Sequence, residues 1–144
     1  MKLTNHAKIE LPAIVGNEGF ARAAVAAFCT PLSPSIEEIN DIKTAVSEAV
    51  TNVIVHAYPG SSGMVFIEVA VYDDNVITIT VTDTGIGVTD VAQAKKPFYT
   101  TKSAEEHSGM GFTIMEAFMD ELDVRSEQGR GTAVMMRKTI KQHA

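Results

Sequence analysis

Two neighbouring segments of alternating residues constrain the fold more than any other feature of this 144-residue sequence. Apolar side chains occupy every second position of residues 65–71 and again of residues 77–81, with the polar turn Asp73-Asp74-Asn75 between them. Because side chains two positions apart lie on the same face of a strand, each segment predicts a strand with one buried face. The short polar connection predicts that the two strands form a β-hairpin.

A long amphipathic helix is predicted before this hairpin. Apolar residues recur at helical spacing between Ile39 and Val53, which indicates one face turned toward a core. We expect Ser35 to cap the helix, since its hydroxyl can accept an orphan backbone N–H. Pro59 and Gly60 should end the helix near Ala57.

The other segments predict two layers in a single domain spanning residues 1–144. They are a first strand over 5–11, an Ala-rich helix over 20–28, a long mobile loop over 84–108, a helix over 111–119, and a closing hairpin with strands from 124 and over 132–136. This order predicts a two-layer α/β sandwich, with helices on one face of a mixed, mostly antiparallel sheet.

Composition limits the class of function. The eighteen acidic residues outnumber twelve basic ones, which argues against general nucleic-acid binding through phosphate contacts. Cys29 is the one cysteine, so the chain can form neither an internal disulfide nor a cysteine-rich zinc site, and a reducing compartment is the simpler interpretation. No apolar run approaches the roughly 20 residues of a membrane-spanning helix, and the N-terminus lacks a signal peptide's apolar stretch. We expect a cytoplasmic protein that contacts neither nucleic acid nor membrane.

The first polar motif lies on the long helix. Glu48, Asn52 and His56 follow one another at four-residue spacing and line up near the border of the buried face. The carbonyl oxygen of Asn suits a hard cation such as Mg²⁺, and Glu can accept a proton from a water or a hydroxyl. The same spacing fits an exposed polar helix face.

The second motif is Asp83-Thr84-Gly85-Ile86-Gly87. Asp83 continues the apolar face of the strand over 77–81, so its carboxylate should be partly buried and need a partner. It could accept a hydrogen bond from the amino group of a bound base. The two glycines would let the backbone turn sharply and approach a ligand closely. An ordinary turn at a strand end has the same composition.

The third motif is Ser108-Gly109-Met110-Gly111-Phe112, immediately before a predicted helix. Backbone N–H groups at a helix N-terminus favour an anion, so this segment is a candidate phosphate cradle. It lacks the P-loop pattern. The alternative is a glycine pair that only caps the helix.

In this order, with a long loop between the second and third motifs, the three motifs resemble those of the GHKL nucleotide-binding superfamily. Residues 42–52, 98–102, 108–116 and 118–120 are similar to the bacterial anti-sigma-factor serine kinases. The resemblance implies the GHKL ATP-binding fold, with ATP or ADP and Mg²⁺ as cofactors. It also implies a homodimer that sequesters a sporulation-type sigma factor and phosphorylates a serine of an anti-anti-sigma partner.

The resemblance also implies roles for the residues of the motifs. Glu48 would be the general base toward the substrate serine, and Asn52 would hold Mg²⁺. Asp83 would bind the adenine amino group, with Gly87 lining the base and Thr132 nearby.

The predicted loop corresponds to the lid over ATP in these kinases. The implied lid and phosphate contacts are Thr100, Thr101, Lys102, Ser108, Gly109, Met110, Gly111 and Phe112. His107 stands where these kinases are expected to have an arginine. This favours, as an alternative, a nucleotide-sensing anti-sigma module with little or no kinase activity. Arg22 is a candidate contact for the sigma factor, although an exposed solubilising arginine fits nearly as well.

Overall fold

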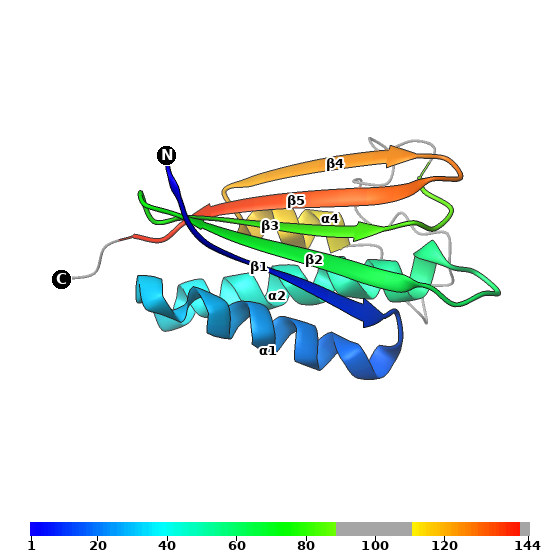
Figure 1. Cartoon of the computed structure of the whole chain (residues 1–144), viewed down its shortest axis with the longest axis horizontal. Helices are drawn as coiled ribbons and strands as arrows, with labels where there is room; N and C mark the ends of the chain where they lie inside the picture. Colours follow the sequence, from blue (N-terminus) through cyan, green and yellow to red (C-terminus); the bar gives the residue numbers. More distant parts are fainter. Residues whose placement is uncertain (89–110, 142–144) are drawn as a thin grey trace.

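The fold is an open antiparallel sheet with helices on one face, seen in a computed structural model that describes residues 1–88 and 111–141 (Figure 1). The described strands form one five-stranded sheet in the order β1-β2-β3-β5-β4, and every neighbouring pair is antiparallel. In chain order the elements are β1 (Leu3–Pro12), η1 (Val15–Asn17), α1 (Glu18–Cys29), η2 (Thr30–Leu32), α2 (Ile36–Asn52), η3 (Val53–Ala57), β2 (Met64–Tyr72), β3 (Val76–Asp83), α4 (Gly111–Phe118), β4 (Glu121–Glu127) and β5 (Gly131–Thr139).

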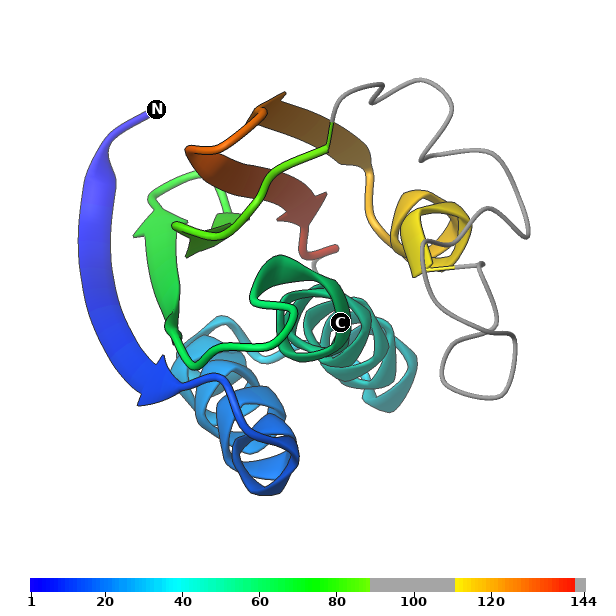
Figure 2. The same ribbon diagram turned by 90° about the vertical axis from the view of Figure 1, so that its right-hand side faces the viewer.

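The helices lie together against the curved sheet, as the end-on view shows (Figure 2). Helix α2 packs between α1 and α4. Its stripe of Ile42, Val46 and Val50 is fully buried against the inner face of the sheet. The sequence predicted this stripe and the two-layer arrangement, and the structure confirms both.

The register of the central strands explains why the sheet buries one face. β2 and β3 pair Ile67 with Val81 and Val69 with Ile79, so the apolar sets of the two strands lie directly opposite each other. A shift of one residue would turn these side chains toward the other face, so burial fixes the register. Both predicted hairpins and the first strand are confirmed, with strands extending one to several residues beyond the predicted bounds.

Helix α2 begins as the sequence predicted. Ser35 Oγ accepts the backbone N–H of Glu38 at 3.0 Å, and the Glu38 carboxylate accepts the backbone N–H of Ser35 at 2.9 Å. This capping box satisfies two orphan groups at the helix start. The far end differs from the prediction, because α-helical geometry stops at Asn52 and Val53–Ala57 form a π-helical turn. The α-helical spacing that aligned His56 with Glu48 and Asn52 therefore ends one turn early.

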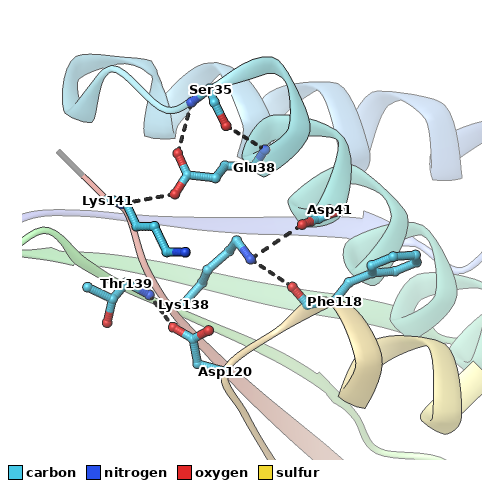
Figure 3. Close-up of polar contacts among 8 residues, drawn as sticks. All are labelled: Ser35, Glu38, Asp41, Phe118, Asp120, Lys138, Thr139 and Lys141. Atoms are coloured by element: carbon cyan, nitrogen blue, oxygen red, sulfur yellow. Dashed lines mark hydrogen bonds and ion pairs between the residues drawn. The ribbon is translucent and has the colours of Figure 1, made fainter. Parts of the chain in front are cut away.

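A buried lysine joins three elements at the end of the molecule away from this π turn (Figure 3). Lys138 on β5 donates to the carbonyl oxygen of Phe118 at 2.8 Å and lies 3.5 Å from the carboxylate of Asp41 on α2. Glu38 also accepts the backbone N–H of Lys141 at 2.9 Å. These contacts fasten the end of β5 to the start of α2 and the C-terminal end of α4.

Cys29 lies fully buried in the core at the end of α1. Burial raises the pKa of its thiol to about 12, so the thiol is neutral at neutral pH and acts as a core side chain. Within the two described stretches of chain, no helix is both long and apolar enough to cross a membrane.

Candidate functional site

The first wall of the site is formed where α2 meets the start of α4. Gly111 lies so close to α2 that a methyl group on its Cα would be 3.1 Å from both amide atoms of Asn52 and 3.4 Å from Glu48 Oε2. The first and third sequence motifs, 63 residues apart from Glu48 to Gly111, therefore come together. A glycine here lets backbone approach two polar side chains closely.

The second wall is formed by Asp83 at the end of β3. This residue is only 6% exposed, and its Oδ1 accepts the backbone N–H of Gly85 at 2.9 Å. Burial raises the pKa of the Asp83 carboxyl above its ordinary value, while the backbone N–H groups of Gly85 and Thr132 lower it in part. The prediction of a partly buried carboxylate is confirmed.

Thr132 pairs with Asp83 across β3 and β5, so the two predicted base-pocket residues are neighbours. The hydroxyl of Thr132 lies 2.9 Å from that of Ser126 on β4. Ser126 Oγ also accepts the backbone N–H of Val88 at 2.6 Å. The sequence did not predict this role of Ser126, because nothing in an alternating strand indicates that a serine hydroxyl will accept a backbone N–H 38 residues away.

The segment after Asp83 is held from both sides. Ile86 donates its backbone N–H to the carbonyl oxygen of Ala57 at 2.9 Å and accepts from the backbone N–H of Gly129 at 2.7 Å. Gly87 has a φ of +74°, and a Cβ there would lie 2.4 Å from the carbonyl oxygen of Glu127. The backbone of Glu127 therefore requires glycine at Gly87, and the close approach of Gly87 to a ligand stays a prediction.

An open pocket of about 360 Å³ lies between α1 and α2 beside the first wall. Its lining comprises Arg22, Asn40, Lys43, Thr44, Ser47 and Glu48. The Glu18 carboxylate lies 3.5 Å from the Arg22 guanidinium and accepts a hydrogen bond from the hydroxyl of Ser47. Arg22 is thus exposed at the rim of a pocket that contains Glu48, rather than isolated on the surface.

The remaining predicted residues of the lid and phosphate cradle lie outside the described residues. They are Thr100, Thr101, Lys102, Ser108, Gly109 and Met110, together with His107. Of the third motif, Gly111 and Phe112 are described, and Phe112 packs against the core from the first turn of α4.

The donor set at the first wall fits a magnesium ion that is shared with a ligand. Among residues 1–88 and 111–141, no three His, Cys, Asp or Glu side chains gather into a metal cluster. Mg²⁺ is usually held by one or two protein oxygens together with phosphates and waters. The amide oxygen of Asn52 beside the Glu48 carboxylate meets that requirement and would leave the other ligand positions to phosphate.

Comparison with known proteins agrees with the geometry. Residues 12–138 match the family described as "Histidine kinase-like ATPase domain". An anti-sigma F factor of Clostridium perfringens is 51% identical over 139 residues, covering 96% of this chain and 99% of that protein. The anti-sigma F factor of Clostridium beijerinckii is 53% identical over 135 residues, covering 93% and 94% of the two chains.

Solved structures share the fold at lower identity. The RsbU and RsbW domains of a Mycobacterium tuberculosis protein superpose with a TM-score of 0.72 and 21% identity, covering 98% of this chain and 34% of that one. ShkA, solved in complex with AMPPNP, gives a TM-score of 0.58 and 20% identity, covering 92% and 32%. The chain belongs to the histidine kinase-like ATPase domain family and, within it, to the anti-sigma F factors.

Proposed function

We propose that this protein is an ATP-dependent serine kinase that also sequesters a sporulation-type sigma factor. The observation that carries the proposal is the meeting of Glu48, Asn52 and Gly111 beside a pocket that contains Arg22. This arrangement supplies a carboxylate, a hard oxygen donor and a helix start within one small region, with room for a partner's side chain next to the carboxylate. The names of the relatives support the anti-sigma role, and the AMPPNP complex of ShkA supports a nucleotide at the site.

In the proposed complex the adenine base lies at the second wall. Asp83 accepts a hydrogen bond from the adenine amino group, Gly87 lines the base, and Thr132 lies beside them. By the resemblance, the backbone N–H groups of residues 109–112 would bind the phosphates, and Thr100, Thr101 and Lys102 would belong to the lid. Of these residues, Gly111 and Phe112 lie in the part of the chain that the structure describes. Asn52 would hold Mg²⁺, and the ion would neutralise phosphate charge.

In phosphoryl transfer the protein mainly positions the attacking hydroxyl and the γ-phosphate. The serine hydroxyl of the anti-anti-sigma partner gives its proton to Glu48 as its oxygen attacks the γ-phosphorus of ATP. A new oxygen–phosphorus bond forms, the bond between the γ-phosphorus and the bridging oxygen breaks, and ADP leaves with that electron pair. The pocket beside Glu48 is where the serine would enter, and Arg22 at its rim is the proposed contact for the sigma factor.

The proposed active form is a homodimer. Within the described residues the helices lie on one face of the sheet, and the other face is the proposed contact for a second copy (Figure 2). Light scattering on the purified chain tests this directly, with a monomer mass of 15.5 kDa as the contrary result.

The kinase proposal is tested by incubating the protein with Mg-ATP and a candidate anti-anti-sigma protein, then locating the phosphate by mass spectrometry. We expect one phosphoserine with the wild type and a large loss of rate with Glu48→Gln, since a positioned base contributes about 10²–10⁴-fold. Full activity in Glu48→Gln would refute the proposed base role.

His107 favours a second candidate, a nucleotide-sensing anti-sigma module without kinase activity. A neutral histidine neutralises phosphate charge less well than arginine near pH 7. This candidate predicts ATP binding and retention of the sigma factor with no phosphorylated product. In that case His107→Arg should restore phosphoryl transfer.

A further inference from the structure

Tyr58 connects the end of the long helix to the segment that follows Asp83. Its hydroxyl donates to the carbonyl oxygen of Met64 at 2.5 Å and accepts the backbone N–H of Thr84 at 3.0 Å. A tyrosine hydroxyl has one hydrogen to donate and lone pairs to accept, so both contacts can exist together. Thr84, which follows the proposed adenine-binding residue Asp83, is therefore connected through this hydroxyl to Met64, the first residue of β2.

The tyrosine ring has little freedom to move. A Cβ at Gly63 would lie 2.3 Å from two ring carbons of Tyr58, so the backbone of Gly63 packs directly against the ring. Ala57, the last residue of the π turn, adds a second contact through its carbonyl oxygen, which accepts the N–H of Ile86. Two successive residues at the helix end thus hold two amides of the segment after Asp83.

These contacts bear on Asp83 through the short connection between them. The Asp83 carboxylate accepts the N–H of Gly85, which lies between the two amides held by Tyr58 and Ala57. A shift of Thr84 would move both the Asp83 backbone and the amide that orients its carboxylate. The orientation of that carboxylate decides whether it can accept from an amino group on a base.

We propose that Tyr58 is a positioning residue for base recognition, whose hydroxyl strengthens the preference of the site for a 6-amino purine over a 6-oxo purine. The proposal rests on the proposed function, in which Asp83 binds the adenine amino group. Tyr58 touches neither nucleotide nor phosphate in this scheme and acts only through Thr84 and Asp83.

The exposure of Thr84 makes it possible to test the positioning role of Tyr58 without unfolding the protein. Thr84 is exposed, so water can satisfy its N–H when the tyrosine hydroxyl is removed. The ring of Tyr58 against Gly63 remains in Tyr58→Phe. The variant should therefore fold, and its effect should fall on the geometry of the base pocket.

The test compares ADP with IDP, which carries an oxygen where ADP carries the amino group, by isothermal titration calorimetry with Mg²⁺ present. We expect the wild type to bind ADP more tightly, Asp83→Asn to lose most of this preference, and Tyr58→Phe to lower it about fivefold. That factor corresponds to the loss of one hydrogen bond of ordinary strength. Tyr72→Phe, at the far end of β2, is the matched control and should keep the wild-type ratio.

The outcomes distinguish this inference from the proposed function. If Asp83→Asn loses the preference but Tyr58→Phe stays within about twofold of the wild type, the role of Tyr58 is wrong and the base site stands. Equal weakening of ADP and IDP by Tyr58→Phe would also overturn the inference, since it would indicate a general structural effect. A wild type that does not prefer ADP would overturn both.

Discussion

Replacing Gly85 with alanine should destabilise the fold at the junction between the long helix and the base pocket. A Cβ at this position would lie 2.0 Å from the carbonyl oxygen of Ala57 and 2.6 Å from its carbon. Gly85 does not have a positive φ, so an alanine could adopt its backbone conformation without strain. The expected effect is therefore steric.

The structure gives the size of the effect. Atoms that pack well lie about 3.5–4.0 Å apart, so relieving the 2.0 Å approach requires the two backbone segments to separate by about 1.5–2 Å. That movement breaks the 2.9 Å hydrogen bond from the N–H of Ile86 to the carbonyl of Ala57. One lost hydrogen bond costs about 1 kcal/mol, and forcing extra volume into packed structure costs about 1–3 kcal/mol. The free energy of unfolding should fall by about 2–4 kcal/mol.

Urea unfolding followed by far-ultraviolet circular dichroism measures this difference, which suits a chain without tryptophan. With a slope of about 2 kcal/mol/M, the midpoint should fall by about 1–2 M. Gly16→Ala is the matched control, because Gly16 also lacks a positive φ and a Cβ there meets nothing within 4 Å. If the two alanine variants unfold at the same urea concentration, the steric reasoning is refuted.

Three other changes test the remaining structural claims. Asp83→Asn should raise the urea midpoint at pH 7 while weakening ADP binding. Because burial raises the pKa of the Asp83 carboxyl, its contribution to stability is most favourable below about pH 4 and is lost as the pH rises through the folded-state pKa. The stability advantage of Asp83→Asn should therefore shrink toward pH 4. An advantage that is constant with pH would contradict this. Lys138→Met should lower the free energy of unfolding by about 1–3 kcal/mol, because the Phe118 carbonyl and Asp41 lose a buried cation. Lys141→Met changes an exposed side chain and should stay near the wild type in the same urea titration. Ser35→Ala should cost about 1 kcal/mol by thermal or urea unfolding, since it removes half of the capping box, and an unchanged stability would show that the cap contributes nothing.

The two layers of the fold could be predicted because an element buried on one face has apolar residues at regular spacing in the sequence. Val69 and Ile79 belong to separate alternating runs, and the structure pairs them directly on the buried face. Ser35 and Glu38 are three residues apart, so their reciprocal capping is also a local pattern. Alternating runs and capping boxes are formed by residues close together along the chain, so a single sequence is enough to recognise them.

The contacts around Asp83 and the segment that follows it could not be predicted in this way. The π turn over Val53–Ala57 has no signal in the sequence, since its residues fit an α-helix equally well. Ser126 and Val88 are 38 residues apart, and Tyr58 and Thr84 are 26 apart. No periodicity connects a hydroxyl to a backbone amide at such separations.

The contrast between Asp83 and Tyr58 shows what a sequence reveals about a site. Asp83 interrupts an apolar face with a carboxylate, and burial raises its pKa, so its position is unfavourable to the fold unless something binds it. That local conflict is visible in the sequence and pointed to a ligand before any contact was known. Tyr58 conflicts with nothing around it, because a half-buried tyrosine with a satisfied hydroxyl is ordinary. The proposed base-binding residue could therefore be identified from the sequence, whereas the proposed positioning residue could be identified only from its contacts.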